Sequence, residues 1–392
     1  MPCPTPLEEL MRATDAAKQA TIGLPASTSP GEHRFPLTPE GAGILVERGF
    51  TVKMEAGAAN NIHYPDEAYV RRGVRIVERD EALGADIVIY LPALSEHDAR
   101  HIRRGGLLLT FGHLGPDNIS ALNALLARHV IVLDIRMIAD NTGHLPFADI
   151  LHEIDGRASM AIASSLLADA IHGKGILLGG VAGVVPCEVL IIGSDIAAVA
   201  AARSALGLGA TVKIFDNNIY RLREALASLP SGVQGSALHP RVFENALRSA
   251  DIVIATDTAP RCGTVDSTLA NIMKRGVICF DLTSEPGKAF PAMPLVDLDL
   301  ASPSDTDPSI PVRLCYINAG NAVPRTAAMA LTNTFATLLD DILVCDGVAN
   351  VLKLNEGLRR ATLLFLGKCV NPDAARLLGA RHVDINLFLQ FS

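Results

Sequence analysis

The chain has 392 residues, a length that suits two domains better than one. Apolar residues make up 49% of the sequence and charged residues 19%, so a disordered or fibrous protein is excluded and large buried cores are expected. The formal net charge is −8 and the pI is near 5.8, which excludes the basic surface that nucleic-acid binding requires.

Short apolar runs alternate with helical patterns along most of the chain, as is typical of parallel α/β proteins. A first series of strands is predicted at Thr21–Leu24, Thr51–Glu55, Asp86–Leu91, Leu107–Phe111 and Val130–Asp134. Helices are predicted within this series at Pro39–Glu47 and Asp117–Arg128.

A second series of strands is predicted at Glu188–Ile192, Thr211–Asp216, Asp251–Ala255 and Val277–Asp281. Helices are predicted at Ser194–Leu206 and Ile219–Ala227, a surface loop at Ser302–Pro311, and a long helix from about Arg325 to Val348. We therefore expect an α/β fold with two doubly wound sheets and ligand sites at the C-terminal ends of the strands.

The stretch Gly175–Gly193 has the length of a membrane-spanning helix, but its glycines, Pro186 and Glu188 favour a loop that leads into a buried strand. The N-terminus lacks the apolar region of a signal peptide. Seven cysteines without a C-x-x-C pair indicate reduced thiols. We expect a cytoplasmic protein that binds neither a membrane nor nucleic acid.

A dinucleotide-binding pattern follows the strand Glu188–Ile192. This strand leads into a turn that contains Gly193, Ser194, Asp195 and Ala198, then into an Ala-rich helix and a strand that ends at Asp216. An acidic residue at this distance binds the adenosine ribose in such folds, and Asp216 favours NAD over NADP because no basic residue follows it directly. Arg221, in the next turn, is expected beside the adenine.

Asp195 occupies the second glycine position of this pattern, where a glycine lets the backbone approach a pyrophosphate. A carboxylate about 5 Å from a phosphate charge would cost on the order of 3 kcal/mol. The conflict is avoided if Asp195 turns away and caps the helix that it begins. Otherwise the fold is a scaffold whose cofactor binding is weakened or lost.

Four further motifs occur in an order that resembles the alanine dehydrogenase family and the related N-terminal part of pyridine nucleotide transhydrogenase. They are GEHRFPLTPEG (31–41), GHL (112–114), GKGILLGGVAGVVP (173–186) and NAVPRTAAMALTN (321–333). The resemblance implies that residues 1–146 and 318–392 form a discontinuous catalytic domain, with a Rossmann-type NAD domain, residues 147–317, inserted in it. It also implies NAD as cofactor, a small amino acid or 2-oxo acid as substrate, and a homo-oligomer, either a dimer or a hexamer.

The resemblance assigns roles to individual residues. Arg34 matches the arginine that binds the substrate carboxylate, a task that suits a planar guanidinium. His113 matches the general acid/base, and Glu285 matches an aspartate near the nicotinamide and the substrate. Asn318 matches a position beside the nicotinamide, and His152 replaces a small polar residue that neighbours the cofactor.

Pro92 departs from the family pattern, because it replaces a lysine that contacts the substrate carboxylate. Proline supplies neither a charge nor an N–H group. Arg136, just beyond the strand Val130–Asp134, is the candidate substrate-binding residue that would replace this lysine. His97 and His101 have the spacing of helical metal ligands, but no third ligand accompanies them, so we expect no metal site.

These residues predict an NAD-dependent oxidoreductase acting on the CH–NH2 or CH–NH group of a small amino acid or its imine. Without the lysine, we expect a substrate other than plain alanine. Three alternatives remain: an opine-type synthase that joins an amine to a 2-oxo acid, a cyclodeaminase that uses NAD as an internal relay, and a redox-inactive binding homologue. The coincidence of Asp195, Pro92 and His152 motivates the last.

Overall fold

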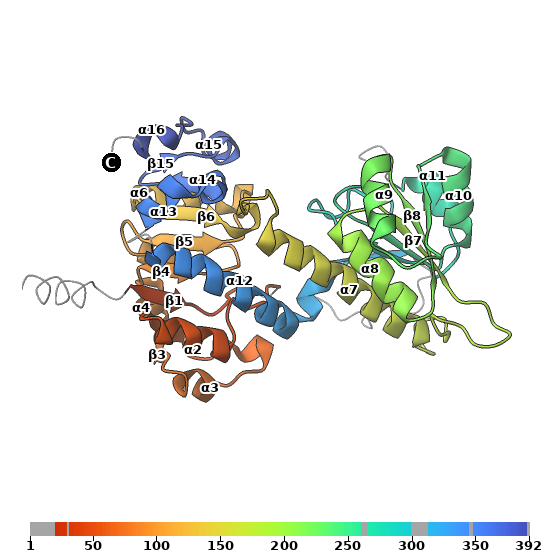
Figure 1. The fold of residues 1–392 in the computed structure, drawn as a ribbon, viewed down its shortest axis with the longest axis horizontal. Coiled ribbons are helices and arrows are strands. Elements are labelled where there is room, and N and C mark those ends of the chain that lie inside the picture. Colours follow the sequence, from red (N-terminus) through yellow and green to blue (C-terminus); the bar gives the residue numbers. More distant parts are fainter. Residues whose placement is uncertain (1–19, 30, 260–264, 299–312, 345–347, 390–392) are drawn as a thin grey trace, which may run out of the picture. The chain divides into compact units, whose positions relative to one another are not determined.

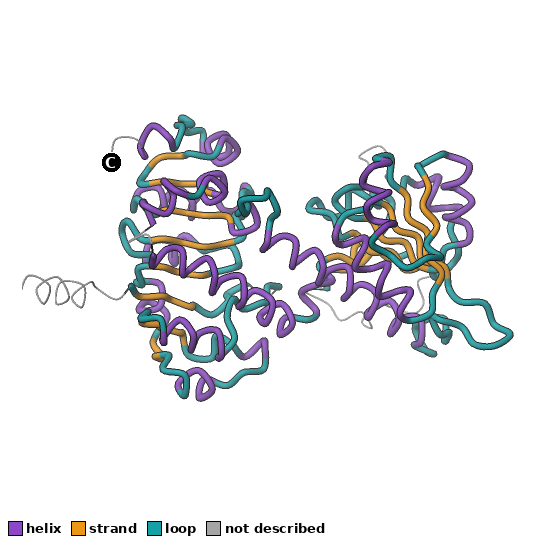
Figure 2. Tube along the Cα trace, in the orientation of Figure 1, coloured by secondary structure: helices purple, strands orange, loops and turns teal. Residues whose placement is uncertain are grey.

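A computed structural model describes residues 20–29, 31–259, 265–298, 313–344 and 348–389. The chain divides into two compact units, each with one sheet of its own (Figure 1). The first unit consists of the described parts of Met1–Thr28, Phe35–Gly143 and Leu331–Ser392, and the second of Ser29–Arg34 and His144–Ala330. In Figure 2 the strands of each unit gather in one sheet and helices surround it.

The sheet of the first unit has the strand order β15-β14-β6-β5-β4-β1-β2-β3. Pairing is parallel from β6 to β3, whereas β14 runs antiparallel to both β6 and β15. The strands are β1 Thr21–Leu24, β2 Thr51–Glu55, β3 Arg75–Val77, β4 Ile87–Ile89, β5 Leu107–Thr110, β6 Ile131–Asp134, β14 Thr362–Phe365 and β15 Lys368–Cys369. The central strands β4, β5 and β6 are buried along their whole length, as expected of parallel strands covered on both faces.

Short helices cover this sheet, and α2 shows why the sequence starts a helix where it does. Thr38 caps α2 by accepting a hydrogen bond from the Gly41 backbone N–H, and Pro39 occupies the first turn. The helices are α2 Pro39–Glu47, η1 Asn60–Ile62, α3 Asp66–Val70, α4 Arg79–Leu83, α5 Glu96–His101, η2 Pro116–Asn118, α6 Ile119–Ala127, η3 Ile135–Met137, α13 Val348–Leu354, α14 Glu356–Ala361, α15 Pro372–Leu378 and α16 Asn386–Leu389. Helix α12, Pro324–Val344, has residues in both units.

The sheet of the second unit is wholly parallel, with the order β12-β13-β11-β10-β7-β8-β9. Its strands are β7 Glu188–Ile192, β8 Thr211–Phe215, β9 Gln234–Ser236, β10 Ile252–Ala255, β11 Ile278–Asp281, β12 Leu295–Asp297 and β13 Leu314–Ile317. Its helices are α7 Pro146–Ala168, α8 Ile196–Gly207, α9 Ile219–Ala227, α10 Pro240–Ser249, α11 Ser267–Ile272 and η4 Ala319–Ala322. The predicted α/β fold with two parallel-sheet domains is therefore confirmed.

Helix α7, which carries His152 and Asp155, packs closely on α8. At Gly156 a Cβ atom would lie 2.2 Å from the Ala197 carbonyl oxygen, so only glycine lets the two helices approach this closely. Helix α7 lies outside the predicted elements. Many of its buried positions hold Ala, Gly or Ser, as at Ala158 and Ser159, and such residues produce a weak hydrophobic period.

The division into units differs from the boundary expected between residues 317 and 318. Residues 318–330 belong to the second unit, as does Ser29–Arg34. The reason is local hydrogen bonding: the Gly320 N–H donates to Asp155 of α7, and the Asn321 side chain binds the backbone of Gly31 and His33. The predicted loop Ser302–Pro311 lies outside the described residues.

The stretch Gly175–Gly193 consists of a loop followed by β7, as expected from its composition. Among the helices of the described residues, none combines the length and the apolar character needed to cross a membrane. The four cysteines that the structure describes as free, Cys187, Cys279, Cys315 and Cys369, are all buried.

Candidate active site

The turn between β7 and α8 retains the close backbone approach of a dinucleotide-binding fold. Gly193 has a φ of 108°, and a Cβ atom there would lie 2.2 Å from Thr256 Oγ1, so only glycine fits. The Ser194 N–H donates to Thr258 Oγ1 at 2.9 Å. Ala198, in the first turn of α8, is fully buried.

Asp195 uses both carboxylate oxygens within the protein. Its Oδ1 accepts from the Ala198 N–H at 3.0 Å and so caps α8. Its Oδ2 accepts from the N–H of Thr258 at 3.0 Å and from the Thr258 hydroxyl at 3.1 Å. Capping, one of the two alternatives for this residue, is therefore what the structure shows. The carboxylate nevertheless remains at the helix N-terminus, which is the place where such folds hold a diphosphate.

Asp216 directly follows β8, and its side chain is 1% exposed. The Ser194 hydroxyl donates to Oδ2, and the Asn218 N–H donates to Oδ1 at 2.7 Å. Arg221 Nη2 lies 3.3 Å from Oδ1. Both carboxylate oxygens of Asp216 therefore have partners within the protein.

Ser194, Asp195 and Arg221 line one cavity of about 390 Å³ together with residues of α8 and α9. This lining suits NAD only in part. Ser194 and Arg221 supply polar groups at the cavity, whereas Asp216 is buried, hydrogen-bonded within the protein and absent from the lining. Asp195 adds a negative charge, which opposes a diphosphate.

A second cavity, of about 80 Å³, lies where β11 ends in the second unit. It is lined by Arg34, Asp155, Asp281, Leu282, Thr283, Pro286, Asn318, Ala319 and Asn321. Glu32 orients the Arg34 guanidinium through two parallel hydrogen bonds, Nε to Oε1 at 2.8 Å and Nη2 to Oε2 at 2.6 Å. Such a fork-like pairing holds the guanidinium plane in one direction.

Asp155 of α7 contributes a carboxylate to this cavity. Its Oδ1 accepts from the Gly320 N–H at 2.8 Å. Burial raises the pKa of Asp155 above its ordinary value, and the positive charge of Arg34 opposes that rise. The cavity therefore combines a fixed cation with a carboxyl group whose proton is held more tightly than usual.

Two asparagines complete the lining of this cavity. Asn318 has a left-handed backbone with a φ of 60°, and its Nδ2 donates to Asp297 Oδ1 at 2.8 Å. Asn321 accepts from the His33 N–H at 3.2 Å and donates to the Gly31 carbonyl oxygen. Asn321 thereby ties the segment that carries Arg34 to η4.

The loop after β11 is held by Asp281. Its Oδ1 accepts from the N–H and hydroxyl of Thr283, at 3.1 and 2.6 Å, and its Oδ2 accepts from the Gly287 N–H at 2.8 Å. Glu285 lies in this loop, is exposed, and pairs with Lys288 at 2.6 Å. Its neighbour Pro286, and not Glu285 itself, is among the residues that line the cavity.

His152 meets the same loop through Asp257. The Ser284 N–H and hydroxyl both donate to Asp257, and His152 Nε2 lies 3.4 Å from Asp257 Oδ2. His152 therefore links α7 to the loop that carries Glu285. No sequence motif marks Asp155 or Asp257, and their partners are distant in the chain, so the sequence did not indicate these two residues. Asn321 begins the motif at 321–333, but the motif did not indicate that its side chain binds Gly31 and His33.

In the first unit, His113 follows β5 after the turn at Gly112. A Cβ atom at Gly112 would lie 2.1 Å from Asp134 Oδ2, and its φ is 54°. His113 Nε2 lies 3.0 Å from the Leu91 carbonyl oxygen, which can only accept, so Nε2 is the donor in this hydrogen bond. Pro92 comes next in the chain, so no ammonium group stands at this strand end.

Arg136 is held at the same edge of the first sheet. Its Nη2 lies 3.2 Å from Asp134 Oδ2 and donates to the Phe111 carbonyl oxygen, and the guanidinium stacks 5.7 Å from the centre of the Phe111 ring. Its role as a replacement for the family lysine stays a prediction.

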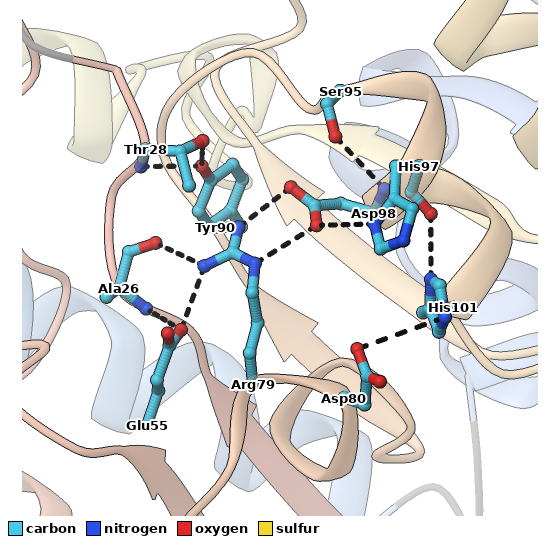
Figure 3. A network of polar contacts seen from close by, with 10 residues as sticks. All are labelled: Ala26, Thr28, Glu55, Arg79, Asp80, Tyr90, Ser95, His97, Asp98 and His101. Atoms are coloured by element: carbon cyan, nitrogen blue, oxygen red, sulfur yellow. Dashed lines mark hydrogen bonds and ion pairs between the residues drawn. The ribbon is translucent and has the colours of Figure 1, made fainter.

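A charged network also lies in the first unit, around Arg79 (Figure 3). Arg79 donates to both oxygens of Asp98, at 3.0 and 2.8 Å, and to Glu55 at 2.9 Å. The guanidinium lies 5.9 Å from the centre of the Tyr90 ring. Burial acts to raise the pKa of Asp98, but the hydrogen bonds and charge of Arg79 outweigh it and hold that pKa below its usual value.

The rings of His97 and His101 on α5 lie with their centres 4.5 Å apart and their planes tilted by 37°. Within the part of the chain that the structure describes, no group of three His, Cys, Asp or Glu residues could hold a metal ion.

Two family models match the chain. The alanine dehydrogenase/PNT N-terminal domain matches residues 23–152, and the alanine dehydrogenase/PNT C-terminal domain matches residues 159–372. The chain belongs to the alanine dehydrogenase/PNT family. The resemblance seen in the sequence motifs is thus confirmed.

Alanine dehydrogenase of Staphylococcus saprophyticus is 30% identical over 377 residues, which cover 94% of this chain and 100% of the relative. Alanine dehydrogenase of Mycolicibacterium smegmatis is 30% identical over 323 residues, covering 80% of this chain and 85% of the relative. The chain is therefore homologous to alanine dehydrogenases, oxidoreductases that act on CH–NH2 donors.

Two solved structures share the fold of this chain. An L-alanine dehydrogenase superposes with a TM-score of 0.79 at 25% identity, over 92% of this chain and 99% of the other. The transhydrogenase from Sinorhizobium meliloti shares the fold, with a TM-score of 0.71 at 20% identity over 90% of this chain and 99% of the other.

Proposed function

We propose that this protein is an NAD-dependent oxidoreductase that acts on the CH–NH2 or CH–NH group of a small amino acid or its imine. The observation that carries the proposal is the Arg34 guanidinium, which Glu32 orients at a polar cavity of the second unit. This chain belongs to a family whose C-terminal domain binds NAD(H).

For the cofactor, we assign the adenosine ribose to Asp216 and the adenine side to Arg221. Gly193, Ser194 and Ala198 would form the turn below the diphosphate, and NAD supplies the hydride acceptor when it is bound. Asp195 opposes the diphosphate, so we expect weaker NAD binding than a glycine there would allow.

For the chemistry of the chain itself, Arg34 would bind the substrate carboxylate and His113 would exchange a proton with the substrate. The hydrogen bond from Nε2 to the Leu91 carbonyl oxygen would orient the imidazole ring. Glu285 would act from an exposed loop, which Asp281 holds in place. Asn318 and His152 are assigned to the nicotinamide side of the second unit.

The substrate is expected to differ from plain alanine, because Pro92 removes an ammonium group and Arg136 is held by Asp134. An opine-type reaction, in which a larger substrate brings its own amine, suits this loss. Cyclodeamination with NAD as an internal relay is a further alternative. A redox-inactive binding homologue is the candidate that the two hydrogen-bonded oxygens of Asp195 favour.

The test starts with NADH fluorescence on titration into the protein. Saturable binding supports the proposal, and no binding at hundreds of micromolar would leave the redox-inactive homologue. Nicotinamide absorbance is then followed with 2-oxo acids, first with ammonia and then with small amines. NADH consumption that depends on an amine supports the opine-type reaction, whereas bound NADH without net consumption points to the relay.

We also propose a homo-oligomer, dimeric or hexameric, formed in part through the loop before β7. This loop exposes apolar side chains to an unusual degree: Val181 is 60%, Val184 60% and Val185 87% exposed. Light scattering on the intact protein and on a Val185→Asp variant tests this proposal. We expect a smaller assembly for the variant, and an unchanged mass would exclude this loop from the interface.

A further inference from the structure

Three charged residues of the described chain line the 80 Å³ cavity: Arg34, Asp155 and Asp281. Arg34 has a role in the proposed function and Asp281 holds the loop after β11, whereas Asp155 has no role so far. We propose that Asp155 receives the amino or imino nitrogen of the substrate whose carboxylate Arg34 binds. The inference rests on the proposed function and narrows it, because it makes the ligand an α-amino acid or a secondary amino acid held at both its charged groups.

The carboxylate of Asp155 is held in place by one hydrogen bond and can accept more. Oδ1 is fixed by the Gly320 N–H at 2.8 Å. Among the described residues, no group donates a hydrogen bond to Oδ2, although Asp155 lines the cavity. A carboxylate can accept about four hydrogen bonds, so this side chain has capacity for a ligand donor.

The charges around Asp155 leave room for a cation. Arg34, His152 and Asp257 are the ionisable groups that act on it. Arg34 already forms two hydrogen bonds with Glu32, and His152 faces Asp257, so each of these two side chains has a carboxylate partner besides Asp155. An ammonium or iminium group would therefore supply Asp155 with the partner that the protein does not.

The size of the cavity agrees with a small polar group. A volume of about 80 Å³ is large enough for several water molecules or for a small polar group. That space suits the amino and carboxylate groups of an amino acid. A 2-oxo acid with the same carbon skeleton carries no N–H donor, so it would bind through Arg34 alone. Asp155 should therefore strengthen the binding of amino acids and leave the binding of 2-oxo acids unchanged.

The experiment compares matched ligands on matched variants by isothermal titration calorimetry. The amino-acid ligands are L-alanine and N-methyl-L-alanine, and the affinity of each is compared with that of pyruvate, with and without saturating NADH. Asp155→Asn keeps an oxygen for the Gly320 N–H and removes the charge. Asp149→Asn removes the same charge from α7 at a residue that does not line the cavity, and serves as the control.

We expect Asp155→Asn to weaken binding of the amino acids by about tenfold or more and to change pyruvate binding less than twofold. Arg34→Lys should weaken both classes, and Asp149→Asn neither. Equal losses for both classes with Asp155→Asn, or no loss for either, would overturn the inference. If the wild-type protein binds neither class at millimolar concentration, the inference fails as well.

Failure of the proposed function gives a different result. Amino acids would then bind in an Asp155-dependent way, while no amino acid or 2-oxo acid changes the nicotinamide absorbance. The role of Asp155 in binding would stand, and oxidoreductase activity would be excluded.

Discussion

Asp195 Oδ1 accepts a hydrogen bond from the Ala198 backbone N–H at 3.0 Å, so a carboxylate of the protein itself stands at the N-terminus of α8. In a dinucleotide-binding fold this N-terminus attracts the diphosphate. The chain therefore retains a helix N-terminus that attracts anions, and the Asp195 carboxylate already binds one of its N–H groups. Thr258 donates two further hydrogen bonds to the same carboxylate.

The first prediction concerns the affinity for NADH. Asp195→Gly removes the charge and should tighten NADH binding by up to about a hundredfold, because a charge conflict of about 3 kcal/mol corresponds to that ratio. Asp195→Asn keeps a capping side chain and should give part of this gain. Fluorescence titration measures both dissociation constants, and equal values for the wild type and both variants would show that Asp195 does not face the diphosphate.

The second prediction concerns packing of α7 on α8. Gly156→Ala places a Cβ atom 2.2 Å from the Ala197 carbonyl oxygen, so the helices must separate, at an expected cost of about 1–3 kcal/mol. Gly207→Ala, at the end of α8, has no atom within 4 Å of the new Cβ and should leave stability unchanged or slightly raised. Urea unfolding compares the midpoints; similar midpoints for the two variants would contradict the close packing.

The third prediction is a pH dependence of stability. The folded-state pKa of Asp98 lies below its usual value, so its stabilising contribution is present above the unfolded pKa and is lost as the pH falls through the folded value. Asp98→Asn breaks the pair with Arg79 and should cost about 3 kcal/mol near neutral pH. The difference between variant and wild type should shrink below about pH 4. Thermal unfolding from pH 7 to pH 3 tests this, and a constant difference would refute it.

The fourth prediction concerns His113. His113→Ala should lower turnover by about a hundredfold or more, because a positioned acid/base contributes about that much, while the unfolding midpoint stays close to that of the wild type. The matched control is His97→Ala on α5, where the side chain is 75% exposed and turnover should not change. Turnover that persists in His113→Ala would remove this residue from the proposed mechanism.

Much of the fold follows from local patterns. The strands β1, β2 and β7 and the helices α2 and α9 have the bounds predicted for them, because each has a distinct apolar run or amphipathic period and clear turn residues at its ends. The antiparallel strands β14 and β15 were not predicted. These two short strands, joined by Leu366 and Gly367, have no sequence pattern that distinguishes them from other short apolar segments. They form strands because β14 pairs with β6, at the edge of the parallel part of the sheet, and β15 pairs with β14.

The candidate site was predicted less completely. Motif positions suggested Arg34, His113, Asp216 and Asn318, and the structure places Arg34 and Asn318 in the lining of one cavity. The roles of these residues stay predictions. Glu285 is exposed beside Lys288, a result that its motif position did not indicate.

The sequence by itself determined that this chain builds two parallel α/β domains of a known family, because hydrophobic period, glycine turns and motif order are local properties. Only the tertiary structure decided that Asp155 shares a cavity with Arg34 and that Asp195 uses both its oxygens within the protein. The physical reason is that hydrogen bonding and charge depend on distance in space. Groups such as Asp155 and Gly320 come within 2.8 Å only after α7 and η4 have packed together.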